Sequence, residues 1–214
     1  ACAARSDGLA SGFVDGCAIW FATGEMDSDS DAGTRRKKEA RQCYQKRAAA
    51  GTLQLPSELN LDQDLGAPLP TDWLAIEIRF KLLSPWYSKD DRPFHVLDNP
   101  VRKDRVFGVP YMSAASWKGL LRWACRMQAS LHEYLQRHGG RMDDWSDPDW
   151  IIHLFGNEKG EKEDFLRGSL AFYPTWFDRV SFEVINPHSR KTRAGKQPIL
   201  YEVVPPDTEG VLGL

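Results

Sequence analysis

The sequence lacks any apolar run close to the ~20 consecutive residues that a membrane-spanning helix requires. It also lacks the motifs of a P-loop, a nucleophile elbow, an HExxH metalloprotease and a dinucleotide-binding turn. These absences give no sign of a helical span and exclude the enzyme classes that those motifs define.

Cysteine is scarce, with 4 residues in 214, and no pair has the CxxC spacing of a zinc or redox site. The cysteines are Cys2, Cys17, Cys43 and Cys125. Their scatter predicts free thiols in a reducing compartment, which favours the cytoplasm.

Positive charge is not in excess either, since the formal net charge is -2. The charges are nevertheless segregated. Basic segments occur at 35–47, 102–105, 118–126 and 188–196, and an acidic segment at 143–149. This pattern predicts a basic groove on an acidic body, with solvated charged faces as the alternative.

The first 70 residues predict an extension. Small and polar residues dominate 1–33, residues 34–50 read as a basic helix with Thr34 as N-cap, and 51–72 form a proline-containing linker. The sequence starts at Ala1 and ends on an apolar stretch typical of the beginning of a strand, so we expect the natural chain to continue beyond Leu214.

From Trp73 onward the pattern predicts an α+β domain over 71–214. Apolar residues alternate over 73–82, as in a strand with one buried face. We expect an irregular segment at 84–112, a helix from Ser113 or Ser116 to about His138, a short helix near 150–155, and strands at 169–172, 180–185 and 199–204. An apolar stripe on the long helix predicts that it packs on one face of an antiparallel sheet. The stripe consists of Trp117, Leu121, Ala124, Gln128, Leu131 and Leu135.

One segment, residues 97–122, carries a specific series of residues. The series consists of Asp98, Pro100, Val101, Lys103, Asp104, Gly108, Pro110, Ser113, Ser116, Lys118, Gly119 and Arg122. In this order it resembles the RAMP superfamily, the backbone proteins of type III CRISPR effector complexes. Residues 168–172, 186–195 and 200–205 resemble later family segments, so the likeness spans roughly 73–214. The chain departs from the family pattern at Ala114-Ala115 and lacks the glycine-rich C-terminal loop. A domain truncated at its C-terminus is therefore one of the alternatives.

The resemblance implies a ferredoxin-like, RRM-like core that polymerises along a guide RNA, with thumb-like loops that kink the guide–target duplex. In active members, an Asp in the loop after the first strand cuts the target RNA with a divalent metal. Asp98 stands at that position, which implies Mg²⁺ or another divalent cation as cofactor.

The residues themselves allow this chemistry. A loop carboxylate at Asp98 can bind Mg²⁺ or act as a general base toward a 2′-hydroxyl. Alternatively, the Asp-Asn-Pro sequence is strong turn chemistry, and Asp98 only hydrogen-bonds its own backbone. Asp104 is expected to form an ion pair with a neighbouring Arg or Lys.

The start of the long helix predicts a phosphate site, because unpaired N–H groups and the helix dipole attract anions there. The alternative is that Ser113 and Ser116 cap the helix and Gly119 permits contact with a sheet. Arg122 and Arg126 either follow the RNA backbone or pair with acidic residues, and Trp117 and Trp123 either stack on bases or join the core. The predicted RNA-binding residues in and before this helix are Arg102, Lys103, Ser113, Ser116, Lys118, Gly119, Arg122 and Arg126.

A basic turn at 187–196 predicts a phosphate clamp on a hairpin arm. Its predicted RNA contacts are His188, Arg190, Lys191 and Arg193, with Lys196 beside them. His188 as an acid–base group in a metal-independent cut is the minor alternative.

The leading hypothesis is therefore a guide-RNA-binding CRISPR subunit that cleaves paired target RNA through Asp98 and a divalent metal. Its partners are the guide RNA, the single-stranded target RNA and other effector subunits. The alternatives are a subunit that binds RNA without cutting it, and a protein-interaction module of the same complex.

Overall fold

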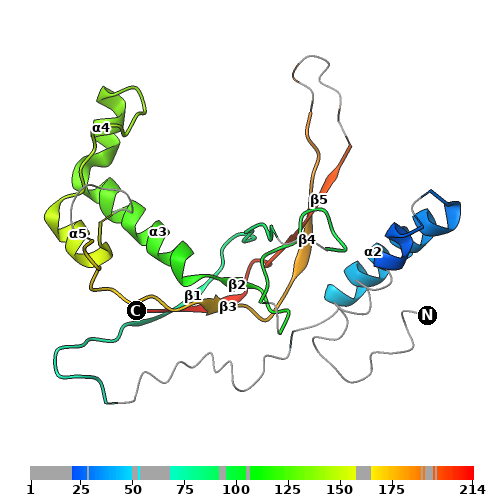
Figure 1. Cartoon of the computed structure of the whole chain (residues 1–214), viewed down its shortest axis with the longest axis horizontal. Coiled ribbons are helices and arrows are strands. Elements are labelled where there is room, and N and C mark those ends of the chain that lie inside the picture. The colour runs from blue at the N-terminus through cyan, green and yellow to red at the C-terminus, as the bar shows by residue number, and fades with distance from the viewer. Residues whose placement is uncertain are drawn as a thin grey trace. The chain divides into compact units, whose positions relative to one another are not determined.

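The computed structural model describes residues 21–27, 29–49, 53, 68–91, 95–104, 107–157, 165–188, 190, 195 and 197–214. Figure 1 shows their arrangement in helices and strands. In chain order these are α2 (Asp31–Ala48), β1 (Glu77–Lys81), β2 (Tyr111–Met112), α3 (Ala114–Arg126), η3 (Met127–Leu131), α4 (His132–Arg137), α5 (Asp149–Phe155), β3 (Thr175–Trp176), β4 (Ser181–Ile185), β5 (Ile199–Val203) and β6 (Glu209–Gly213). Helices and antiparallel strands occur together, so the predicted α+β class is confirmed.

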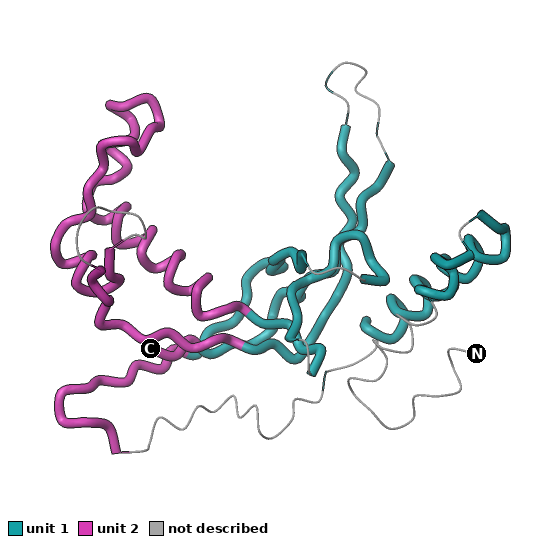
Figure 2. Tube along the Cα trace, viewed as in Figure 1, with its two compact units in different colours: residues 1–64, 79–111, 176–211 teal, residues 65–78, 112–175, 212–214 magenta. Residues whose placement is uncertain are grey.

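The chain forms two compact units (Figure 2). Unit 1 comprises residues 1–64, 79–111 and 176–211, and unit 2 comprises 65–78, 112–175 and 212–214. The division passes within strands β1, β2, β3 and β6, so each of these strands contributes to both units. An extension over 1–70 and a separate domain over 71–214 stay predictions.

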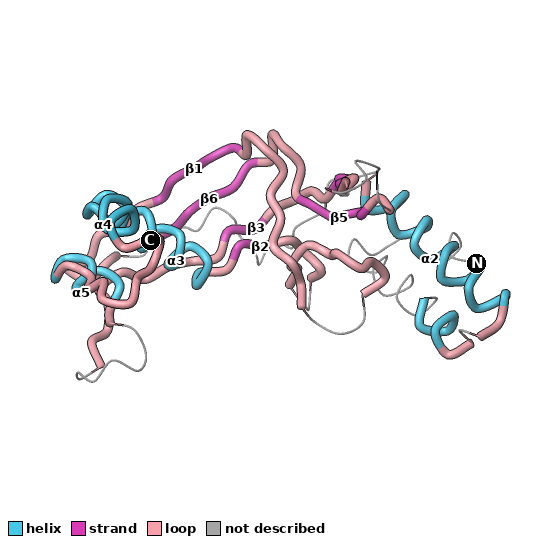
Figure 3. Tube along the Cα trace, turned by 90° about the horizontal axis from the view of Figure 1, so that it is seen from above, coloured by secondary structure: helices cyan, strands magenta, loops and turns pink. Residues whose placement is uncertain are grey.

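The described strands form three two-stranded sheets, β1–β6, β2–β3 and β4–β5. Figure 3 shows β1 beside β6 and β2 beside β3. β4 and β5 form an antiparallel ladder, with Ser181 opposite Val203 and Ile185 opposite Ile199. The predicted strands at 180–185 and 199–204 are thus confirmed, and the apolar end of the sequence forms β6.

Two strand predictions need correction. Residues 169–172 form no strand, because the backbone N–H groups of Ser169 and Leu170 donate to α5 carbonyls at His153 and Leu154 instead. The strand expected over 73–82 is shorter, and in β1 the side chain of Ile78 is 48% exposed. The alternating pattern therefore marks the strand correctly but does not produce a buried face along its length.

α2 confirms the predicted basic helix, but its N-cap is Ser30 and not Thr34. The Ser30 hydroxyl accepts a hydrogen bond from the Gly33 N–H at 2.9 Å, which satisfies one of the orphan donors of the first turn. The helix buries Ala40, Tyr44 and Ala48, which lie at four-residue steps on one face.

The long helix predicted to reach His138 is interrupted. After α3, η3 contains Ser130 with φ of 70°, which is left-handed backbone, and the chain re-enters a helix only at α4. The break disrupts the apolar stripe, of which Leu131 alone is buried. Trp117 does contact a strand, since its indole N–H donates to the Thr175 hydroxyl at 2.8 Å.

The core of unit 1 contains a buried polar cluster of Tyr44, Lys103 and Glu202. The Tyr44 hydroxyl donates to Glu202 Oε1 at 2.5 Å, and the Lys103 ammonium donates both to Glu202 and to the Tyr44 hydroxyl. Glu202 Oε2 accepts from the backbone N–H of Val101 at 3.1 Å. Glu202 is 0% exposed, so these bonds replace the water that its carboxylate loses. The cluster joins α2, β5 and the segment that follows Asp98.

We predict that Glu202→Leu lowers the free energy of unfolding by about 3–5 kcal/mol, because it leaves the Lys103 charge buried without its carboxylate partner. Urea unfolding of both proteins measures the difference. The control is Glu39→Ala, which removes an exposed ion pair with Arg35 and should change stability by less than about 1 kcal/mol. Equal losses in both variants would contradict the assignment. The double variant Lys103→Met/Glu202→Leu should recover much of the loss.

Candidate nucleic-acid interface

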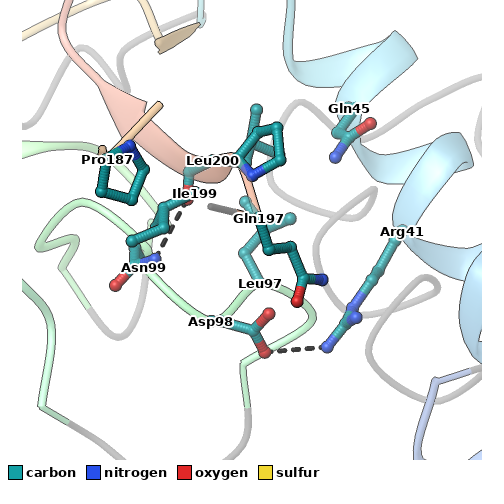
Figure 4. A pocket seen from close by; sticks show the side chains of 10 residues that line it. Arg41, Gln45, Leu97, Asp98, Asn99, Pro187, Gln197, Ile199 and Leu200 are labelled. Carbon is teal, nitrogen blue, oxygen red and sulfur yellow. Dashed lines mark hydrogen bonds and ion pairs between the residues drawn. The ribbon is translucent and has the colours of Figure 1, made fainter. Parts of the chain in front are cut away.

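Asp98 lies on a loop, and its carboxylate is held by Arg41 of α2 (Figure 4). Arg41 donates from Nη2 to Asp98 Oδ1 at 2.8 Å and from Nε to the Val96 carbonyl at 3.1 Å. The Asp98 side chain is 78% exposed and the Arg41 side chain 40%. Arg41 thus fixes one carboxylate oxygen while the group remains open to solvent.

The backbone around Asp98 is anchored to β5. The Asn99 carboxamide donates to the Leu200 carbonyl at 3.1 Å, and the Glu202 N–H donates to the Asn99 carbonyl at 3.0 Å. Among the described residues, the Asp98 carboxylate hydrogen-bonds Arg41 and not its own backbone. The self-contained turn offered as the alternative for Asp98 is therefore not the geometry that these bonds produce.

A cavity of about 560 Å³ opens beside Asp98 (Figure 4). Its polar side chains are Arg41, Gln45, Asp98, Asn99 and Gln197. Leu97, Pro187, Pro198, Ile199 and Leu200 line the rest. The lining comes from α2, from the Asp98 loop and from the β4–β5 hairpin at the turn end of its ladder, three segments far apart in the sequence.

The donor set at Asp98 suits a divalent metal only in part. No group of three or more His, Cys, Asp or Glu side chains gathers anywhere in the described ranges. Mg²⁺, however, keeps several waters and often binds proteins through one or two carboxylates plus substrate phosphates. Asp98 therefore fits a Mg²⁺ ion that is held mainly by an RNA phosphate and water, and not a site made by protein alone.

The start of α3 supports the capping alternative for the two serines. The Ser113 hydroxyl accepts from the Ser116 N–H at 3.1 Å, and the two hydroxyls lie 2.8 Å apart. Lys118 and Gly119 are exposed, and a Cβ added at Gly119 would meet no atom within 4 Å. The alternative for Gly119, contact with a sheet, finds no support within the described chain. A phosphate contact at these residues stays a prediction.

Arg122 and Arg126 converge on Asp147 inside unit 2. Arg122 reaches Asp147 Oδ2 at 2.9 Å from Nε, Arg126 reaches Oδ1 at 2.6 Å, and the Trp145 indole donates to Oδ1 at 2.9 Å. Burial by itself would raise the pKa of the Asp147 carboxyl, but the hydrogen bonds from Arg126, Trp145 and Arg122 outweigh it and lower that pKa to about 2. Both arginines thus form the acidic pairing offered as their alternative, and an additional RNA contact stays a prediction.

The remaining candidates lie in different settings. Lys103 is 9% exposed within the buried cluster, so RNA contact would require that cluster to open. Arg102 donates to the Lys89 carbonyl at 3.5 Å near the surface. Asp104, expected in an ion pair, accepts from the Phe107 N–H at 3.0 Å. Trp123 is 43% exposed.

Part of the predicted phosphate clamp can be placed. His188 forms a bridge to Gly195 across the hairpin, and both His188 and Arg190 are exposed. Lys191, Arg193 and Lys196 lie outside the described residues. The roles assigned to this arm stay predictions.

Comparison with known proteins identifies the family. The model of the RAMP superfamily matches residues 79–211, more than half of the chain. The chain belongs to the RAMP superfamily. The match includes Asp98 and the β4–β5 hairpin but not α2, so this RAMP protein completes its cavity with a helix outside the matched segment.

The fold is also found in a solved structure. A chain in the cryo-EM structure of the type III-B Cmr-β complex bound to cognate target RNA is similar, with a TM-score of 0.59 and 14% sequence identity. The similarity covers 95% of this RAMP protein and 77% of that chain. No curated protein matches. Within the described residues, no helix is both long and apolar enough to cross a membrane.

Sequence patterns did not identify several candidate functional residues of this RAMP protein. Arg41 and Gln45 lie in a helix that contains several other basic and polar residues, so no local signal distinguishes them. Gln197 follows the basic turn without a motif. Asp147 lies in the acidic segment 143–149, but its pairing with two arginines depends on tertiary structure.

We predict that the stabilising contribution of Asp147 depends on pH. Its folded-state pKa of about 2 lies below its ordinary value of 3.8, so the contribution is fully present above about pH 4 and disappears as the pH falls toward about 2. At neutral pH the free energy of unfolding of the wild type should exceed that of Asp147→Asn by about 2 kcal/mol. Urea unfolding at a series of pH values measures this difference. The exposed residue Asp143 provides the control, since Asp143→Asn should show no such trend. A difference that persists at pH 2 would refute the electrostatic explanation.

Proposed function

We propose that this chain is an RNA-binding subunit of a type III CRISPR effector complex in the cytoplasm, and that it cleaves target RNA paired with the guide. Asp98 is the proposed catalytic residue. The observation that carries the proposal is the exposed carboxylate of Asp98, which belongs to the family-matched segment and is held by Arg41 beside a cavity. The resemblance of the fold to a chain of the Cmr-β complex adds support.

The proposed chemistry begins with proton removal. Asp98 accepts the proton of an RNA 2′-hydroxyl, and that oxygen attacks the adjacent phosphorus. The bond to the 5′-oxygen breaks, and the leaving oxygen takes a proton from solvent. The products are a 2′,3′-cyclic phosphate and a 5′-hydroxyl. A bound Mg²⁺ would stabilise charge on the phosphate.

Arg41 has a positioning role in this scheme. Its bonds to Val96 and Asp98 come from one guanidinium group on α2, and α2 is fixed in turn by Tyr44. The carboxylate is therefore oriented before RNA arrives, which reduces the entropy cost of reaching a reactive geometry.

A subunit that binds RNA without cutting it is the second candidate. The observation in its favour is that Asp98 is the one carboxylate among the residues that line the cavity, and that Arg41 already binds it. In that case Asp98 and Arg41 form a structural pair beside the RNA.

Contacts with other effector subunits are proposed for α3. Leu120, Trp123 and Met127 lie at three- and four-residue steps on one face of the helical segment and are 52%, 43% and 37% exposed. An exposed apolar face of this kind favours a protein partner.

Cleavage of labelled target RNA by the assembled guide complex tests the catalytic proposal. Asp98→Ala should reduce the rate of at least one cut by about 10² or more while RNA binding persists, because it removes the proposed general base. A single 2′-deoxy nucleotide at that cut should block it in the wild type, and EDTA should suppress it.

The matched control for this experiment is Asp143→Ala, which removes another exposed carboxylate, in unit 2. It should leave the cut pattern unchanged. If Asp98→Ala leaves every cut intact, the non-cleaving subunit replaces the proposal.

RNA affinity should also fall steeply with salt, because phosphate contacts release counterions. Lys118→Ala should weaken binding similarly for all sequences and reduce the salt slope by about 1. Filter binding across salt concentrations measures both effects, with Arg137→Ala as the exposed control on α4. An affinity that stays flat with salt would eliminate the phosphate-contact assignment.

A further inference from the structure

Three carboxamide groups line the cavity beside Asp98, and the catalytic proposal uses none of them. The Asn99 carboxamide already donates to the Leu200 carbonyl, which leaves those of Gln45 and Gln197. Gln45 comes from α2 and Gln197 from the segment that leads into β5, and both line the same cavity (Figure 4). Neither carboxamide hydrogen-bonds another side chain or backbone group in the described part of the chain. Each therefore presents one donor group and one acceptor group to a ligand.

The rest of the lining suits a flat aromatic ligand. Pro187, Pro198 and Ile199 provide apolar surface without charge. The volume of about 560 Å³ lies within the 300–1,000 Å³ typical of small-molecule sites and is ample for a nucleoside. Apolar walls with a few polar groups at the edge match a nucleobase, whose faces are apolar and whose edge carries the hydrogen-bonding groups.

The available polar groups distinguish among the bases. Guanine is usually read by the paired N–H groups of an arginine, whereas adenine is read by the donor and acceptor of one carboxamide. Arg41 is the arginine of the cavity, and its Nε and Nη2 are already bonded to Val96 and Asp98. The carboxamides of Gln45 and Gln197 are then the groups left to read a base, which favours adenine.

We propose that this cavity binds one unpaired adenine of the RNA, with Gln45 and Gln197 as specificity-determining residues that contact its edge. The base is unpaired because its stacked neighbours in a duplex would cover the faces that the apolar walls of the cavity contact. This inference rests on the proposed RNA-binding function, and it assigns to α2 a role in choosing the nucleotide next to Asp98.

The experiment measures affinity in the assembled guide complex, in EDTA so that cleavage does not intervene. Guide and target are complementary except at one position, where the guide carries an abasic nucleotide and the target carries A, G, C or U. This position is moved along the duplex one nucleotide at a time. A second series places the abasic nucleotide in the target and varies the guide, so that the two possible sources of the base are separated.

We expect one position in one of the two series to show a preference for adenine. RNA with adenine there should bind at least about fivefold more tightly than RNA with any other base. Gln45→Ala and Gln197→Ala should each reduce this preference, and the double variant should abolish it with little change in affinity for the other bases. The control is Gln42→Ala, an exposed glutamine on the same helix that does not line the cavity, and it should keep the full preference.

The outcomes separate this inference from the proposed function. If the complex binds RNA but no position favours adenine, or if the preference survives in the double variant, the adenine site is refuted and RNA binding stands. If the complex binds no RNA at all, the proposed function fails and the inference fails with it. Loss of the preference in Gln42→Ala as well would show a general effect of α2 and would also overturn the assignment.

Discussion

The buried carboxylate of Glu202 is the constraint on which the site depends. A carboxylate with no exposed surface is tolerated only when hydrogen bonds and a counter-charge replace its water, and here Tyr44, Lys103 and the Val101 N–H supply them. Because the three partners come from α2 and from the segment after Asp98, one buried group fixes both elements against β5. The position of Asp98 is therefore a consequence of the core and not of the loop's own turn chemistry.

This arrangement divides the site between two sources. The family-matched segment provides Asp98, Asn99 and the turn end of the β4–β5 ladder, whereas α2, outside that segment, provides Arg41 and Gln45. Tyr44 lies between Arg41 and Gln45 in sequence and faces the core, so a single turn of helix both anchors α2 and projects two side chains toward the cavity. A change in the anchoring would move both of them.

The sequence pattern was sufficient to predict the helices and strands that depend on local interactions. Ladder strands β4 and β5, the short helix α5 and the basic helix α2 were all predicted near their observed bounds. The break at Ser130 was not, because a left-handed serine inside an apolar-periodic helix leaves no mark in composition. For the site, the resemblance pointed to Asp98, but α2 has several arginines, and only its tertiary position selects Arg41.

The sequence also does not show which basic residues are paired with carboxylates of the same chain. The sequence showed basic stripes and implied a basic groove, yet the structure engages Arg41, Lys103, Arg122 and Arg126 with carboxylates of the same chain. A phosphate must compete with these carboxylates for the same guanidinium and ammonium groups, so such residues add less to RNA affinity than their number implies. We therefore expect RNA affinity to depend more on exposed cations such as Lys118 and on contacts that neutral groups can make. The carboxamides proposed to contact a base, those of Gln45 and Gln197, are neutral groups of this kind, and no carboxylate has to be displaced for them to bind.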